Sequence, residues 1–467
     1  MLSRRAMLKQ TSCGFGTLAL SAMMGQDILA KTSPLAPKET PITPRAKRVI
    51  FIFMQGGPSH VDSYDYKPRL VRDDGKSIQF KGVRFKSFGK VSDRKLMKPL
   101  WDFKQYGECG QWVSELFPET AQHVDELCMI HGMQTEGVAH GPATLFLHTG
   151  ATNLVRPSVG SWISYGLGSA NRNLPGFVTI SPTPAKGGPR NYANAFLPTI
   201  YQGTPLGKAG LPSSQARISH LANREITGEE HQRQFDFLQG INREQLKQAQ
   251  YDDVVEAAIE SYELAHRMQL NAPEILDMGG ESGETLAMYG IDQKHTEDFG
   301  RQCLMARRLA EADVRYIQVS YADHSATPRW DQHSNMPKHM DHARATDKPV
   351  AGLLADLKQR GLLEDTLVWW GGEFGRTPFS QGKNGRDHNP RGFTVWLAGG
   401  GVKKGFAYGE TDDIGHYAVR DKVHMHDLHA TILHLLGLHH EQLTYKYAGR
   451  DFRLTDVAGN VVHEIFA

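Results

Sequence analysis

Five apolar runs along the chain predict the strands of a buried sheet. They cover Lys47 to Met54, Leu127 to Ile130, Val314 to Ser320, Leu367 to Trp370 and Phe393 to Leu397. The first run is almost continuously apolar instead of alternating, which is typical of a central parallel strand covered on both faces. Further segments predict helices over 114–126, 243–269, 295–312 and 426–437, and another that contains Asp347 and runs to Arg360. The pattern is that of an α/β chain.

Side chains suited to metal binding or acid–base chemistry lie near the ends of these runs. The candidates are His60, Asp62, His140, Asp331, His333, Glu373 and His388. In an open α/β sheet, ligands gather beyond the carboxyl ends of the strands, because the loops there vary while the strands hold them rigid. We therefore expect these side chains at one edge of the sheet. Two plainer interpretations stay open: a salt-bridged surface loop over residues 366–400, and a capped turn in which Asp62 only satisfies backbone donors.

Histidines are concentrated late in the chain. Twelve of the 22 fall between His324 and His440, so several must be ordinary helix residues, and we assign His434, His439 and His440 to that group. His140 differs, because the predicted order of strand, loop and helix places it near a helix N-terminus. Unpaired backbone N–H groups favour an anion at such a position.

The first thirty residues predict export. Paired arginines at Arg4 and Arg5 precede the apolar run from Cys13 to Met24, and together they resemble a twin-arginine signal peptide. The run is too short and too rich in glycine for a membrane span. We predict a signal peptide over 1–30, a linker over 31–46 and one domain over 47–467, with an irregular, proline-rich insertion at about 164–240. The mature protein would then be periplasmic or extracellular, exported folded and without an integral membrane span.

Composition narrows the function classes. Hydrophobic residues make up 40% of the chain and charged residues 22%, as in a soluble globular protein. The net charge of +2 gives no electrostatic footprint for nucleic acid, so we set that class of partner aside. Four cysteines without a CxxC motif form no disulfide framework. Neither the substrate nor the oligomeric state can be read from these features.

The order of the segments resembles the alkaline phosphatase superfamily, which includes the sulfatases and the cofactor-independent phosphoglycerate mutases. Five motifs are more specifically similar to an exported bacterial family named domain of unknown function 1501. They are KRVIFIFMQGGPSHVD, WDQH, GGEFGRTP, GRDHNP and HDLHATILHLLG, and they span nearly the whole predicted mature chain. The resemblance implies a three-layer α/β/α sandwich with a mostly parallel central sheet.

The resemblance also implies metal ligands. Asp331, His333 and His388 resemble the ligands of one superfamily metal, although the spacing here is Asp-x-His and not Asp-x-x-x-His. At the second metal, Gln55 stands where an aspartate ends the first strand, and Glu373-Phe374 stand in place of Asp-His. Of these positions only Glu373 offers a ligand atom to a metal, so the second site is altered or lost unless His60 or Asp62 substitutes.

The nucleophile departs further from the superfamily pattern. His140 stands where serine, threonine or a modified cysteine would attack, and no Cys-x-Pro-x-Arg signature occurs, so formylglycine chemistry is not expected. His140 remains open as a general base, a covalent nucleophile or a further metal ligand. Arg376 is a candidate bidentate clamp on the anionic group of a substrate.

These features lead to two functional hypotheses. The first is an exported hydrolase of a small or polymeric phosphate or sulfate ester, dependent on a divalent metal, with Zn²⁺ or Mn²⁺ favoured by mixed oxygen and nitrogen ligands. The second is a catalytically degenerate protein on the same scaffold that binds a glycan or an anionic polymer. Whether His140 and Glu373 contact the same cation as His388 should distinguish these two hypotheses.

Overall fold

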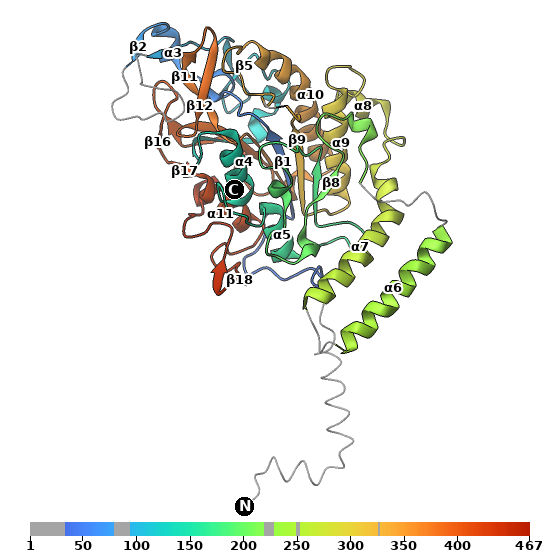
Figure 1. Ribbon diagram of the computed structural model, residues 1–467. Helices are drawn as coiled ribbons and strands as arrows, with labels where there is room; N and C mark the ends of the chain where they lie inside the picture. The colour runs from blue at the N-terminus through green and yellow to red at the C-terminus, as the bar shows by residue number, and fades with distance from the viewer. Residues whose placement is uncertain (1–32, 79–93, 219–227, 249–252, 326) are drawn as a thin grey trace, which may run out of the picture.

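The computed structural model describes residues 33–78, 94–218, 228–248, 253–325 and 327–467 (Figure 1). The predicted signal peptide lies outside the described residues. One nine-stranded sheet forms the centre, in the order β14-β6-β13-β10-β1-β9-β7-β8, with β17 also paired to β6. Its strands are β1 (Arg48–Met54), β6 (Leu127–Gln134), β7 (Phe177–Ile180), β8 (Thr204–Leu206), β9 (Tyr316–Tyr321), β10 (Thr366–Gly371), β13 (Phe393–Ala398), β14 (Phe406–Tyr408) and β17 (Val423–His424).

The sheet is mostly parallel. Strand β1 lies between β10 and β9 and is parallel to both, and β7 continues the parallel order beyond β9. Strand β13 is antiparallel to β10 and to β6. Strand β6 therefore runs in the same direction as β1, β9 and β10. The carboxyl ends of these four strands, and the start of β13, lie at the same edge.

Alternate residues of β1 enter two different apolar cores, which explains its continuous apolar sequence. Ile50, Ile52 and Met54 pack into a core on one face, and Val49, Phe51 and Phe53 pack into a core on the other. Helices α8 (Gly283–Met288), α9 (Glu297–Glu311) and α10 (Lys338–Gln359) contribute to the first core. Helices α4 (His140–Thr149), α5 (Val159–Leu167), α7 (Asp253–Leu276) and α11 (Met425–Leu435) contribute to the second. The predicted α/β/α layering is confirmed.

The remaining helices and strands lie outside the central sheet and the helices that form its two cores. They are helices α3 (Pro68–Arg72) and α6 (Gly228–Gln248) and the strand pairs β2 (Ser77–Ile78) with β3 (Arg94–Lys95), β4 (Phe103–Tyr106) with β5 (Gln111–Ser114), β11 (Gly375–Gln381) with β12 (Gly385–Asn389), β15 (Glu410–Thr411) with β16 (Ala418–Arg420), and β18 (Tyr445–Tyr447) with β19 (Arg450–Phe452). Helix α6 lies outside the layered body, beside α7 (Figure 1).

Three predicted segments differ from the structure. The helix expected over 114–126 is the end of β5 followed by a 3₁₀ helix at Thr120–Glu126, because Pro118 interrupts the segment. The stretch 164–240, expected to be irregular, supplies strands β7 and β8 to the central sheet. The loop expected between Glu373 and His388 contains the β11–β12 hairpin. Short strands such as β8 carry too few residues for a readable periodicity.

Candidate metal centre

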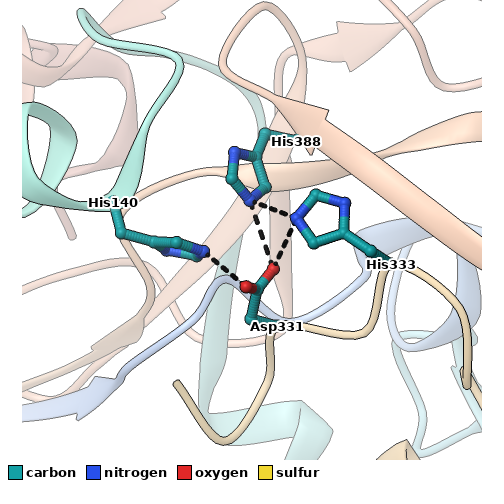
Figure 2. A group of neighbouring side chains, drawn as sticks. All are labelled: His140, Asp331, His333 and His388. Atoms are coloured by element: carbon teal, nitrogen blue, oxygen red, sulfur yellow. Dashed lines mark hydrogen bonds and ion pairs between the residues drawn. The ribbon is translucent and has the colours of Figure 1, made fainter. Parts of the chain in front are cut away.

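Four side chains from separate segments converge at the carboxyl edge of the sheet. They are His140, Asp331, His333 and His388, and one ligand atom of each lies within 4.8 Å of the others (Figure 2). His140 is the first residue of α4, Asp331 and His333 lie between β9 and α10, and His388 lies on β12. This cluster could hold a metal ion.

Asp331 is the centre of the cluster. Its Oδ1 lies 2.9 Å from His333 Nε2 and 3.2 Å from His388 Nε2, while its Oδ2 lies 3.1 Å from His140 Nε2. The Nε2 atoms of His333 and His388 are themselves 2.9 Å apart. Three imidazoles thus present the same ring nitrogen to one carboxylate, as Figure 2 shows.

The other ring nitrogen of each histidine has an oxygen acceptor. His140 Nδ1 lies 2.6 Å from Glu373 Oε1, and His388 Nδ1 lies 2.6 Å from the Val138 carbonyl oxygen. His333 Nδ1 contacts the side-chain oxygen of Gln381. When a ring is neutral, its Nδ1 carries the proton and donates it to this oxygen, and the lone pair lies on Nε2; when a ring is protonated, Nε2 also donates, to Asp331.

This arrangement favours a cation. When the rings are neutral, the lone pairs of the three Nε2 atoms face the Asp331 carboxylate and repel it, so either protons or a metal ion must lie between them. The Nε2 atom of His140, although 3.1 Å from Asp331, makes no aligned hydrogen bond within the described residues. Imidazole nitrogens with one carboxylate oxygen suit Zn²⁺ and related transition metals. Acceptors on the opposite ring nitrogen orient such ligands in known metal sites.

Electrostatics keep Asp331 ionised. Burial alone raises its pKa, but the contacts with His140, His333 and His388 and the charge of Arg376 outweigh burial and hold the pKa below its usual value. The pKa of His388 is lowered, chiefly because burial disfavours the imidazolium. Burial disfavours the charged form of His140 as well, but the contacts with Asp331 and Glu373 outweigh burial and raise its pKa. The contact with Asp331 also raises the pKa of His333. The cluster thus combines an anionic carboxylate with one histidine biased toward the neutral form that binds metals and two that the carboxylates bias toward the protonated form.

Two glycines permit the close approach of the segments that carry the cluster. Gly56 follows β1 with φ +111°, and a Cβ there would lie 2.8 Å from the backbone nitrogen of Asp331. At Gly385, on β12, a Cβ would lie 1.9 Å from the His333 carbonyl oxygen. Only glycine leaves room at these positions, so the loop after β9 can lie between the β1 turn and the hairpin.

Arg376 has a different environment from the substrate clamp that the sequence suggested. It is fully buried and lies opposite His388 in the β11–β12 hairpin. Its guanidinium donates to Asp331 Oδ1 at 2.9 Å, to the Gly57 carbonyl oxygen at 3.0 Å and to the carbonyl oxygens of Gly56 and Arg386. These internal hydrogen bonds hold Asp331 in place and already engage the guanidinium, and the substrate-clamp role of Arg376 stays a prediction.

Glu373 lies behind His140 and is not one of the four clustered residues. Its carboxylate is fully buried, accepts from His140 Nδ1, and has both oxygens 3.1 Å from the backbone nitrogen of Gly56. The structure therefore brings Glu373 to the site as a partner of His140, whereas the sequence suggested a direct metal ligand.

His60 and Asp62 are not part of the cluster. His60 Nε2 lies 2.7 Å from the Gly415 carbonyl oxygen. Asp62 forms a fully buried ion pair with Arg386 at 2.6 Å and accepts from the Ser59 hydroxyl at 2.5 Å. Neither side chain contributes an atom to the four-residue group, because each is engaged in contacts beneath the hairpin.

Two contributors to the site carried no recognisable sequence signal. Gln381 and the Val138 carbonyl orient His333 and His388, yet they lie 48 and 250 residues away from their partners in sequence. Phe374 stacks on the His388 ring at 4.4 Å and lies 5.0 Å from the ring of His140. The sequence resemblance placed Phe374 at a ligand position, but only the tertiary structure shows that its ring packs beside His140 and His388.

The comparisons with known proteins identify a family but no activity. The family model described as "Protein of unknown function (DUF1501)" matches residues 46–466. No protein of curated function has a matching sequence. Among the described residues, none of the helices combines the length and the apolar character that crossing a membrane requires.

Solved structures match over most of their length at low similarity. They include the lipoteichoic acid synthase LtaP of Listeria monocytogenes, at a TM-score of 0.39 and 9% identity, covering 90% of this chain and 78% of that one. The PsFucS1 sulfatase of Pseudoalteromonas sp. has a TM-score of 0.34 and 11% identity, covering 91% and 71%. The alkaline phosphatase of the Antarctic bacterium TAB5 has 0.31 and 10%, covering 80% and 97%. At these TM-scores we infer no activity for this chain from them.

Proposed function

The chain belongs to the DUF1501 family, whose function is unknown, and from its metal centre we propose that it is a metal-dependent hydrolase of phosphate or sulfate esters. One observation carries the proposal. Three buried or partly buried imidazoles have their Nδ1 atoms committed to oxygen acceptors and their Nε2 atoms directed at the carboxylate of Asp331. Such a set of ligand atoms suits a metal ion, which would replace the protons that otherwise lie between the rings and Asp331.

The contacts of Asp331 separate the proposed metal ligands from His140. His333 and His388 share its Oδ1, so these three residues would hold the cation, whereas His140 contacts Oδ2. A tetrahedral zinc ion bound by all four residues would keep no position for water. We therefore propose that His140 serves as the general base or as a further ligand that exchanges with the substrate. When bound, the metal would polarise an ester oxygen and lower the pKa of bound water toward neutrality.

The surrounding residues enclose the cluster and leave it open to a substrate on one side. Glu373 is fully buried and orients His140, and Arg376 is fully buried and holds Asp331. Phe374 covers one face of His388 and keeps water from that side. The His333 side chain, at 30% exposed, is the most open of the four, so a substrate would approach beside it. Zn²⁺ or Mn²⁺ is the proposed metal.

We also propose that the protein is exported in the folded state. The paired arginines and the apolar run of residues 1–30 support a twin-arginine signal, and 31–46 would form the linker to the mature domain. A folded export route suits a protein that acquires its metal before crossing the membrane. The substrate would then be an anionic ester of the periplasm or the medium.

Metal content of the mature protein, purified without chelator, tests the proposal. We expect about one equivalent of transition metal by elemental mass spectrometry in the wild type and less than about a tenth in His388→Ala. His434→Ala is the matched control, because His434 is a half-buried histidine of α11 outside the cluster. Thermal melting verifies that both variants fold. Hydrolysis of p-nitrophenyl phosphate and p-nitrophenyl sulfate by the loaded protein then tests the activity.

Two results would count against the hydrolase. Absence of metal in the wild type, even after addition of Zn²⁺ or Mn²⁺, would overturn the metal site. Stoichiometric metal without hydrolysis of either ester would favour the alternative of a binding protein. One observation favours that alternative specifically: none of the four clustered side chains carries a hydroxyl or thiol that could attack an ester.

A further inference from the structure

A second concave site lies away from the metal centre, among α7, α8, α9 and the segment after β8. Its cavity has a volume of about 740 Å³. Helix α7 contacts α9 here, and its C-terminal end packs into the same core as α8 and α9. The volume falls within the range of about 300–1,000 Å³ that is usual for small-molecule sites. None of the residues that line it belongs to the metal cluster.

Most of the wall is apolar. It comprises Ala216, Ile218, Pro273, Leu276, Met278, Leu286 and Met305. Ile218 and Leu276 also line a small inner crevice with Leu206 and Leu309, so the apolar surface continues toward the sheet. Two methionines in the wall add unbranched, polarisable side chains that adapt to a flexible apolar ligand. This part of the cavity suits a hydrocarbon body.

The charged side chains of the wall are two arginines and one aspartate. The polar residues of the wall are Ser213, Ser214, Arg217, Asp277 and Arg301. Arg301 is paired with Glu297 at 3.2 Å, and Asp277 accepts from the backbone nitrogen of Gly279 at 2.9 Å. Arg217 donates only to the carbonyl oxygens of Ala216 and Ser214, at 2.7 and 3.3 Å, and no carboxylate of the described residues lies within ion-pair distance of it.

We propose that this cavity binds an amphipathic anion, with its apolar body against Leu276, Leu286 and Met305 and its acidic group at Arg217. The apolar wall supplies affinity through burial of hydrocarbon surface. The planar guanidinium of Arg217 can accept a carboxylate in a bidentate geometry. A cation of the same chain length would have only Asp277 as a partner, whose carboxylate already accepts from the Gly279 nitrogen, so we expect it to bind more weakly.

Calorimetric titration of the full-length protein with dodecanoate tests the site. We expect saturable binding of one dodecanoate, and binding of dodecyltrimethylammonium at least about tenfold weaker, because the charge of the head group is reversed. Arg217→Glu should weaken dodecanoate binding at least about tenfold. Arg190→Glu is the matched control, since Arg190 is another exposed arginine that does not line the cavity, and it should bind as the wild type does.

Two further variants separate the possible outcomes. Leu286→Trp should block the cavity and abolish binding, and circular dichroism verifies its fold. His388→Ala should bind dodecanoate unchanged, so failure of the metal hypothesis would leave this site intact. The proposal is overturned by a wild type that does not bind dodecanoate, by equal affinity for the cationic analogue, or by an Arg217→Glu variant that binds like the wild type.

Discussion

The two ends of helix α4 both meet histidines, but these histidines are bonded in opposite ways. At the N-terminal end, His140 joins His333 and His388, and all three direct Nε2 toward the carboxylate of Asp331. At the C-terminal end, His426 and His429 of α11 direct Nε2 to the carbonyl oxygens of Gly150 and Leu147, at 3.0 and 2.9 Å. The last carbonyls of a helix have no partner within it, so these two rings complete α4.

The contrast shows that a concentration of histidines does not by itself indicate a site. What distinguishes the two groups is the atom that each Nε2 faces. A carbonyl oxygen requires a proton on Nε2 and makes the ring a neutral structural donor. A carboxylate that faces three lone pairs calls for a cation. Three predictions test this distinction, from the largest expected effect to the smallest.

The largest effect is expected at Glu373, the partner of His140. Glu373→Ala removes the acceptor that orients the ring, and we expect a loss of about 10–100-fold in metal affinity, as for other partners of metal-binding histidines. Glu373→Gln keeps an oxygen acceptor without the charge and should recover part of the loss. Competition with a fluorescent chelator measures both affinities. If His140 takes no part in holding the metal, both variants will bind it as the wild type does.

A smaller effect is expected at His429, in the structural group. His429→Leu leaves the buried carbonyl of Leu147 without its donor, which should cost about 1–3 kcal/mol of unfolding free energy. Metal content should not change. Urea denaturation gives the free energy, with His434→Leu as the control on the same helix, for which a change below about 0.5 kcal/mol is expected. Loss of metal in His429→Leu would erase the distinction between the two groups.

The smallest effect concerns pH. Burial lowers the pKa of His429 to about 3. At pH values between about 3 and 6.5, His429 is therefore protonated in the unfolded chain and neutral in the folded chain. The contribution of neutral His429 to the free energy of unfolding is fully present above pH 6.5 and is lost as the pH falls toward 3. Between pH 6.5 and 5.5 this one group should remove about 1 kcal/mol of stability. Urea denaturation at both pH values should show that decrease diminished in His429→Leu, and an equal decrease in both proteins would contradict the assignment.

The sequence by itself determined the layers of the fold. The unbroken apolar run of β1 requires cover on both faces, and the structure provides two cores that receive its alternate residues. Helices α9 and α11 lie within two residues of their predicted bounds. The sequence also placed candidate ligands in loops that follow parallel strands, because the carboxyl ends of such strands share one edge.

Only the tertiary structure decided which candidates meet and in what roles. Asp62 and Asp331 are both aspartates near strand ends, yet one is bonded to Arg386 and the other to three histidines. Glu373, which follows β10, and Arg376, on β11, are both fully buried, and they contact His140 and Asp331 from behind the cluster. The physical reason is that the ring nitrogen a histidine presents depends on what its other nitrogen contacts. Those contacts join residues up to 250 positions apart, which no local pattern records.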